Sequence, residues 1–126
     1  ARELYLKPFE MLVREAHIAC IMTSFNKING VFAGGSKDLC TRILREEWGF
    51  DGHVVSDCWA IKDFHENHLV TGTPVQSAAL AMEAGCDLNC GVTYLHLVHA
   101  CQQGLVTADH GSGGPAVHNT DFAWDV

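Results

Sequence analysis

Four stretches of the chain carry apolar residues at the spacing of an amphipathic helix. The first covers residues 6–16, and the second begins at Ser36, whose hydroxyl can cap its first turn. The third opens on a capping-box pattern at residues 73–76, with proline at the first helical position, and stops at Gly85. The last covers residues 93–104, with Thr93 as its expected cap, and ends at a glycine. The pattern therefore predicts four helices.

Short apolar runs lie between these helices. Residues 18–22 and 54–55 are continuous runs, typical of strands covered on both faces, and residues 86–89 predict a third short strand. Residues 26–35 are rich in Gly and Asn and predict a loop, whereas residues 59–69 predict a loop with helical character. Helices and strands thus alternate along the chain.

This alternation indicates a parallel sheet and an α/β fold class. Three strands are few for such a sheet, and a complete (β/α)8 barrel needs about 250 residues, whereas this chain has 126. We therefore predict a partial (β/α)8 (TIM) barrel of about three βα units with parallel strands, occupying residues 1–106. Residues 107–126 are turn-rich without a clear period and predict an irregular or disordered tail.

The amino-acid composition limits the kinds of molecule that the chain is expected to bind. The chain is 48% hydrophobic and 18% charged, with a formal net charge of −7. This acidic balance argues against a nucleic-acid or anionic-membrane surface and fits a neutral substrate such as a sugar. No apolar stretch approaches the roughly 20 residues of a membrane helix. The start lacks both an initiator Met and the segments of a signal peptide, so we expect the chain to begin inside a longer gene.

Six cysteines bear on the redox environment. Their even number leaves a disulfide framework open. Because their spacing is irregular and several lie inside apolar runs, we predict mostly buried free thiols in a reducing compartment. The compartment itself stays open, with the cytoplasm slightly favoured.

Two aspartates follow predicted strands. Asp57 stands where the run of residues 53–56 leaves the sheet, and Asp87 has the same kind of position one βα unit later. Ligands bind at the carboxyl ends of parallel strands, so Asp57 can attack an electrophilic carbon there, or it can cap the following helix. Asp87 could complete an acid/base pair. The alternative, which we prefer, is that Asp87 buttresses a loop or bonds a backbone N–H.

Other residue types give weaker signals. The cysteines and histidines lack the paired spacing of a regular zinc site, so we predict no metal site and expect no cofactor. A small metal-binding protein is therefore the weakest of three functional hypotheses. Trp59 follows Asp57 closely and can line a pocket, whereas Trp48 is expected to pack at a helix end.

Five segments of the chain, in the right order, carry a family resemblance. They are residues 2–10, 22–26 with 29–31, 43–52, 54–57 and 84–89, the fourth reading Val-Val-Ser-Asp. With them the chain resembles glycoside hydrolase family 3, in the second half of its N-terminal (β/α)8 barrel domain. The resemblance covers residues 2–107.

The resemblance implies hydrolysis of terminal β-glucosides or β-xylosides with retention of configuration. Asp57 corresponds to the nucleophile of that family, and Met22, Phe25 and Trp59 are the expected substrate-binding residues. The family's general acid/base is supplied from outside this segment, so it is assigned to no residue here. The chain departs from the family where Phe25 replaces a common Tyr and where Cys58, rather than Trp, directly follows the nucleophile.

Parts of the family pattern are absent from the sequence. The Lys-His pair and the early aspartate that grip the sugar would precede residue 1, and the segment after residue 107 departs wholly from the family. An out-of-frame or truncated gene end is our hypothesis for that segment. We therefore predict a fragment of a larger glycosidase, inactive alone, whose partners are a carbohydrate and the missing remainder of the barrel. The alternative is a non-catalytic, degenerate gene product or interaction module.

Overall fold

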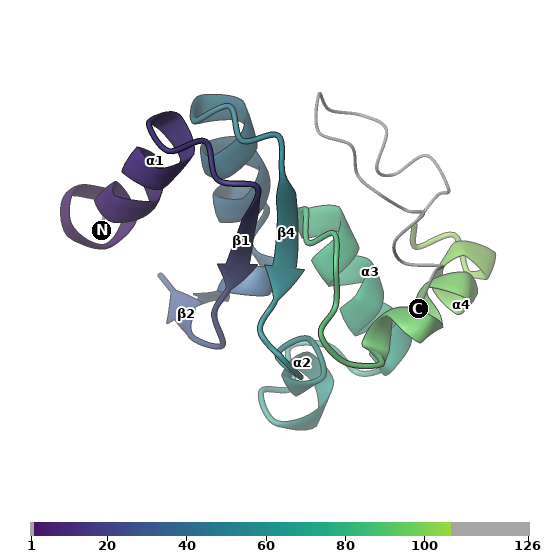
Figure 1. Ribbon diagram of the computed structural model, residues 1–126. Coiled ribbons are helices and arrows are strands. Elements are labelled where there is room, and N and C mark those ends of the chain that lie inside the picture. Colours follow the sequence, from purple (N-terminus) through teal and green to yellow (C-terminus); the bar gives the residue numbers. More distant parts are fainter. Residues whose placement is uncertain (1, 107–126) are drawn as a thin grey trace.

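Two parallel strands form the centre of the computed structural model, which describes residues 2–106. Strand β1 (Cys20–Thr23) pairs in parallel with strand β4 (His53–Ser56). Leu88 adds a single parallel bridge to Val55, on the other side of β4. Figure 1 shows β1 and β4 side by side and pointing the same way. The predicted α/β fold with parallel strands is confirmed.

The third predicted strand, residues 86–89, is present only as this bridge. The N–H groups of Asp87 and Leu88 both donate to the carbonyl of Val54, at 2.8 and 3.0 Å. Two donors on one carbonyl interrupt the evenly spaced ladder of a parallel pair. The segment therefore follows β4 closely without forming an extended strand.

Helices make up most of the remaining regular structure. Within the described residues they are η1 (Arg2–Leu6), α1 (Lys7–Arg14), the 3-10 helix η2 (Ala33–Gly35), the π-helix η3 (Asp38–Glu47), α2 (Asp63–Glu66), α3 (Pro74–Ala84), the 3-10 helix η4 (Thr93–His96) and α4 (Leu97–Gln102). The four predicted helices are thus present, although the first and last are each divided into two helical types. Residues 59–69 contain only the short α2, in agreement with the predicted loop of helical character.

The ends of α3 follow the sequence signals. Thr73 Oγ1 accepts a hydrogen bond from the Gln76 N–H at 3.2 Å, and Pro74 opens the helix. The Gln76 side chain accepts the N–H of Gly72, at 2.8 Å, whereas a regular capping box would use that of Thr73. Gly85 ends the helix with a φ of +107°, which glycine adopts at little cost.

Of the two other predicted helix caps, Ser36 and Thr93, only the first is present. Ser36 behaves as expected, because its Oγ accepts the N–H of Leu39 at 3.2 Å. The expected cap by Thr93 is wrong. The helix η4 begins after Val92 and no side chain caps it.

A short hairpin replaces the loop predicted for residues 26–35. Strands β2 (Lys27–Ile28) and β3 (Val31–Phe32) pair antiparallel around a two-residue turn. The turn residues Asn29 and Gly30 both have positive φ, +52° and +83°. This is the geometry that Asn-Gly favours in tight hairpins, so the turn was encoded, but strands of two residues are too short to give a periodic pattern.

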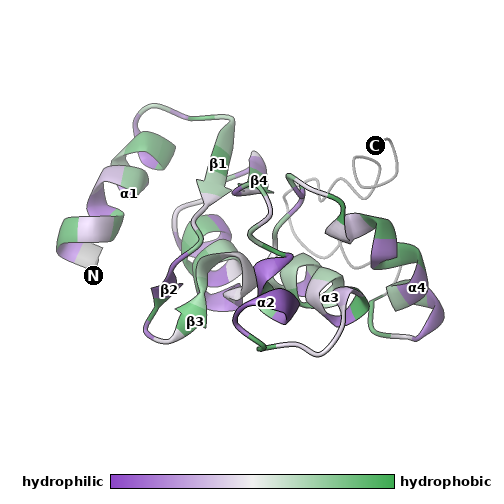
Figure 2. Cartoon of the chain, turned by 90° about the horizontal axis from the view of Figure 1, so that it is seen from below, coloured by the Kyte–Doolittle hydropathy of each residue, from purple (hydrophilic) through white to green (hydrophobic). Residues whose placement is uncertain are grey.

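The core lies between the sheet and the helices on one of its faces. Val54 and Ile61 are fully buried and Phe64 nearly so, and each such side chain contributes about 1.5–3 kcal/mol when it leaves water. The opposite face of β1 is open, since Cys20 and Met22 are both exposed. Figure 2 shows that β1 is nevertheless largely hydrophobic. This chain therefore covers only one side of its sheet.

The cysteines correct an expectation. Cys58 and Cys90 form a disulfide, and Cys20 is free but exposed, so the prediction of mostly buried free thiols is wrong for these three. It is correct for Cys40 and Cys86. Burial raises the pKa of the Cys40 thiol to about 12 and likewise raises the pKa of the Cys86 thiol. The disulfide removes the ground for expecting a reducing compartment, because such bonds persist where the environment is oxidising.

Two further sequence predictions concern membrane-spanning helices and the C-terminal segment. No helix within residues 2–106 is long and apolar enough to cross a membrane. The predicted irregular tail, residues 107–126, lies outside the described residues.

Candidate active site

Asp57 lies directly after β4, at the carboxyl end of the sheet. Its backbone N–H donates to the carbonyl of Thr23, the last residue of β1, at 3.0 Å. The side chain is half-buried, and its Oδ1 accepts the N–H of Cys58 at 2.8 Å. Oδ2 has no hydrogen-bond partner among the described residues. One carboxylate oxygen is therefore held by the loop while the other is left for a ligand.

The alternative reading of Asp57 as a helix cap is wrong. The next helix, α2, begins after Lys62, and no side chain caps it. The only helix-like contact of Asp57 is through its backbone carbonyl, which accepts the N–H of Ala60 at 3.1 Å. The Asp57 carboxylate thus has no role in stabilising α2.

The loop after Asp57 is joined to the segment that follows Leu88. Cys58 forms its disulfide with Cys90, across a Cα–Cα distance of 4.4 Å. The N–H of Trp59 donates to the carbonyl of Cys90 at 2.7 Å. Trp59 has a φ of +68°, a left-handed conformation that is uncommon for a residue with a bulky side chain. Two successive residues after Asp57 are therefore held by the same neighbour.

Ser56, which directly precedes Asp57, is also bonded to the segment that contains Leu88 and Cys90. It is almost fully buried, and its N–H donates to the Leu88 carbonyl at 2.8 Å. Its hydroxyl accepts the N–H of Cys90 at 3.0 Å and donates to Asn89 Oδ1 at 3.4 Å. The residues before and after Asp57 are both bonded to residues 88–90.

Asp87 has a structural role, as preferred from the sequence. It is buried, and its Oδ2 accepts the N–H of Val54 at 2.8 Å and pairs with Arg45 Nη2 at 2.6 Å. Arg45 also donates to the carbonyl of Gly52 at 3.2 Å. Val54 precedes Asp57 by three residues, which is about 10 Å along a strand. Asp87 therefore binds the start of β4 and does not form a carboxylate pair with Asp57 at its end.

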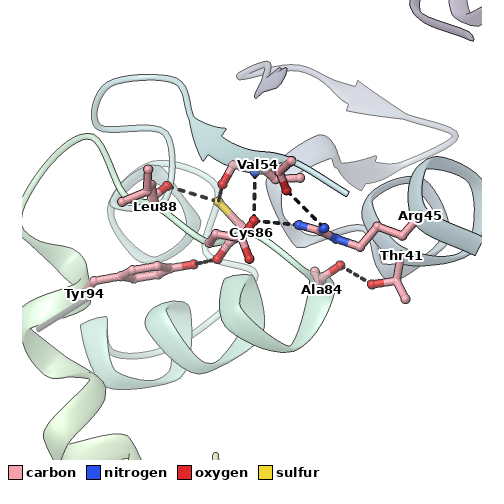
Figure 3. A network of polar contacts seen from close by, with 9 residues as sticks. Thr41, Arg45, Val54, Ala84, Cys86, Leu88 and Tyr94 are labelled. Atoms are coloured by element: carbon pink, nitrogen blue, oxygen red, sulfur yellow. Dashed lines mark hydrogen bonds and ion pairs between the residues drawn. The ribbon is translucent and has the colours of Figure 1, made fainter. Parts of the chain in front are cut away.

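Two further hydrogen bonds hold the segment that carries Asp87. The Tyr94 hydroxyl donates to the carbonyl of Cys86 at 2.5 Å, and the Thr41 hydroxyl donates to the carbonyl of Ala84 at 2.9 Å. Figure 3 shows these bonds together with the Arg45 side chain, which extends toward Val54 and Cys86. Burial raises the pKa of Tyr94 well above its usual value, so its hydroxyl stays a donor. This network fixes β4 and residues 84–88 against each other.

The three expected substrate-binding residues lie near the same end of the sheet. Met22 pairs with Val55 in the register of β1 and β4 and is 58% exposed. Phe25 follows β1 and is 39% exposed, and Trp59 is 51% exposed. The Trp59 ring packs against Gly91, where an added Cβ would lie 3.3 Å from it. All three present apolar surface to solvent at or near the strand ends, and their contact with a sugar stays a prediction.

An apolar cavity of about 120 Å³ lies beside β1 and has Met22 among its lining residues. It is lined by residues of α1, β1 and η3, among them Phe9, Ile21 and Leu44. Asp57 is not among its lining residues, and the surface is almost entirely apolar. The cavity therefore belongs to the packing between helices and sheet and is not the candidate active site.

The histidines and cysteines offer no metal site in the part of the chain that is described. No group of three or more His, Cys, Asp or Glu residues is placed there to hold an ion. His65 Nδ1 instead bonds Ser77 Oγ at 2.8 Å, and the His68 ring packs on Phe32 at 4.3 Å. These two histidines act in packing.

Comparison with known proteins places these features in a family. Residues 1–110 match the model of the glycosyl hydrolase family 3 N-terminal domain. The chain is 44% identical over 109 residues to a probable exo-1,4-beta-xylosidase of Aspergillus clavatus, and 42% identical over 109 residues to one of Neosartorya fischeri. In both cases the match covers 83% of this chain and 14% of the relative.

A solved structure agrees with the sequence relatives. The β-glucosidase EmGH1 of Erythrobacter marinus superposes with a TM-score of 0.79 at 33% identity, covering 83% of this chain and 14% of that one. The chain thus spans about one seventh of the length of the relatives that it matches. The match to the family model and the sequence identity to its members show that the chain belongs to glycosyl hydrolase family 3, within its N-terminal domain.

Proposed function

We propose that this chain supplies the nucleophile of a retaining β-glycosidase, and that Asp57 is that nucleophile. The observation that carries the proposal is the position of Asp57 at the carboxyl end of β4, half-buried, with one carboxylate oxygen held and the other left unbonded by any residue in the described part of the chain. Active sites of barrel enzymes lie at this end of the strands. The family membership adds the reaction class.

The chemistry requires two displacements at one carbon. An oxygen of Asp57 attacks the anomeric carbon while the glycosidic C–O bond breaks, and the departing oxygen takes a proton from a general acid. Water then attacks the same carbon, giving its proton to the conjugate base of that acid and releasing the sugar and the Asp57 carboxylate. We assign no described residue to the general acid, and in particular not Asp87, which is buried against Arg45.

The relatives support a substrate class of terminal β-xylosides or β-glucosides. Two relatives are named as exo-xylosidases and one structural neighbour as a β-glucosidase. The exposed aromatic surface of Phe25 and Trp59 near Asp57 fits a sugar ring, which stacks on aromatic faces. Choice between the two sugars is left to experiment.

One observation favours a second candidate, a non-catalytic interaction module. Leu4 and Tyr5 in η1 are 77% and 74% exposed, and Met22 is exposed on the uncovered face of β1. Exposed apolar surface of this kind marks contact with other polypeptide segments. The same surface is also expected of a barrel segment separated from its neighbours, so it does not oppose the first proposal.

The experiment uses a full-length host, because the isolated chain is expected to be inactive. Residues 2–106 replace the matched segment of the Aspergillus clavatus relative, and the product is called the graft enzyme below. Hydrolysis of nitrophenyl β-xyloside and β-glucoside is measured for the graft enzyme, for Asp57→Asn and for Asp51→Asn. Asp51 is an exposed acid just before β4 and serves as the matched control.

We expect Asp57→Asn to lower kcat/KM by a factor on the order of 10⁴ or more, since the attacking group is lost. Asp51→Asn should stay within about twofold of the graft enzyme. Equal activity of the graft enzyme and Asp57→Asn would refute the assignment and favour the non-catalytic alternative.

A further inference from the structure

The segment around Asp57 is joined to residues 88–90 by one covalent bond and four hydrogen bonds, one of which runs from the Ser56 hydroxyl to Asn89 Oδ1. Ser56 donates its N–H to Leu88, Cys90 donates its N–H to the Ser56 hydroxyl, and Trp59 donates its N–H to the Cys90 carbonyl. The disulfide between Cys58 and Cys90 lies among them. These links are made by residues just before and just after Asp57 in the sequence.

The regular sheet does not extend this far. Within residues 2–106, the bridge between Val55 of β4 and Leu88 is the only ladder contact that the neighbouring segment makes with β4. Past Leu88 the backbone pairing gives way to a side-chain hydroxyl, a disulfide and one N–H bond. The disulfide thus joins the two segments at the point where strand pairing ends.

The loop conformation that results is not one the chain would adopt freely. Trp59 is held at a φ of +68°, which is disfavoured for a residue with a Cβ and persists only where neighbouring contacts determine it. The N–H of Cys58 is also the donor that holds Asp57 Oδ1. Any movement of Cys58 therefore moves the hydrogen bond that orients the carboxylate.

We propose that Cys58 and Cys90 are positioning residues for Asp57, and that the reaction needs their disulfide intact. The inference rests on the proposed function of Asp57 as nucleophile. It assigns to the bond a role in orienting the carboxylate, beyond holding the fold together. It also implies that the protein works in an oxidising compartment, where such a bond persists.

The bond is accessible to a reductant. Cys58 is exposed and Cys90 is half-buried. Dithiothreitol supplies two electrons and two protons, the Sγ–Sγ bond breaks to give two thiols, and the reagent closes to its own cyclic disulfide. The buried thiols Cys40 and Cys86 carry no disulfide and are unchanged by this reaction.

The test measures kcat and KM of the graft enzyme separately, oxidised and after reduction, together with the variants Cys58→Ser, Cys90→Ser and the double variant. Cys20→Ser is the control, because Cys20 is a free cysteine at the first residue of β1, outside the disulfide. Melting temperature is followed in every sample, and the reduced enzyme is reoxidised to show that the loss reverses.

The positioning role predicts a loss of about 10- to 100-fold in kcat, with KM within about threefold, because a displacement of about 1 Å at the reacting group costs that much. The two single variants and the double variant should lose equal amounts, since each removes the same bond. Reduction should add no further loss in the double variant, whereas Cys20→Ser should keep full activity and full sensitivity to the reductant.

Two results would overturn the proposal, and they are distinguishable. If Asp57→Asn is inactive but the double variant keeps the kcat of the graft enzyme, the disulfide does not position the nucleophile. If Asp57→Asn is active, the proposed function fails and the positioning role fails with it. A loss that appears only as a lowered melting temperature, with kcat unchanged below it, would show a purely structural bond.

Discussion

Arg45 offers the sharpest test of how the start of β4 is supported. Its guanidinium and the Asp87 carboxylate are 5% and 1% exposed, and their closest atoms are 2.6 Å apart. Replacing Arg45 with Met fills much of the same volume but removes the guanidinium that pairs with this buried carboxylate. The Val54 N–H, at 2.8 Å, would still donate to Asp87 Oδ2.

The free-energy cost of this substitution follows from the burial of the ion pair. Removing one member of a buried ion pair destabilises by about 3–5 kcal/mol. At a factor of ten for every 1.4 kcal/mol, local opening of β4 should become at least about 100-fold more frequent. Arg42→Met is the control on the same helix, because Arg42 is 49% exposed and pairs with Asp38 and Glu47 at the surface. Such pairs are worth about 1 kcal/mol or less, which is roughly fivefold.

The assay is hydrogen exchange of the graft enzyme, read by mass spectrometry on peptides covering β4 and residues 84–90. Arg45→Met should lose protection there by at least about 100-fold, and Arg42→Met by about fivefold or less. Adding Asp87→Asn to Arg45→Met should restore part of the protection, because the unpaired charge is then gone. Equal exchange in Arg45→Met and Arg42→Met would refute the reasoning that this buried pair supports β4.

Two further predictions concern the reactivity of the free cysteines and the replacement of two glycines. In the isolated chain, iodoacetamide should modify the exposed Cys20 quickly and leave Cys40 and Cys86 unmodified until the chain unfolds, because burial raises the pKa of both thiols. Peptide mapping gives the order of modification, and faster labelling of Cys40 or Cys86 would contradict this prediction. Gly52→Ala should destabilise by about 1–3 kcal/mol, because its Cβ would lie 2.1 Å from a backbone oxygen, whereas Gly72→Ala meets only a flexible side chain and should change the melting temperature little.

Local signals in the sequence were sufficient for most elements. Thr73, Pro74 and Gly85 define α3 because each acts on its own backbone neighbours, and such contacts are legible in a short window. The position of Asp57 after an apolar run likewise placed it at a strand end. Asp87 could be given a structural role, but its partner Arg45 is 42 residues away, and that pairing could not be predicted.

The disulfide was missed although a signal existed. Cys58 and Cys90 each lie just beyond a predicted strand, and the carboxyl ends of adjacent parallel strands meet at one edge of a sheet. Irregular sequence spacing says nothing about such a contact, because the intervening residues form a loop and a helix that return the chain to the same edge. The short strands β2 and β3 were missed for a different reason: two residues each cannot show an alternation.

The central claim is that Asp57 becomes covalently bonded to the sugar. An activated 2-deoxy-2-fluoro-β-glycoside slows the second displacement, so the intermediate accumulates and can be digested and mapped by mass spectrometry. We predict that the added sugar mass is found on the peptide containing Asp57, in step with loss of activity, and that Asp57→Asn takes up none. A label on any other carboxylate, or continued turnover with no labelled peptide, would contradict the account.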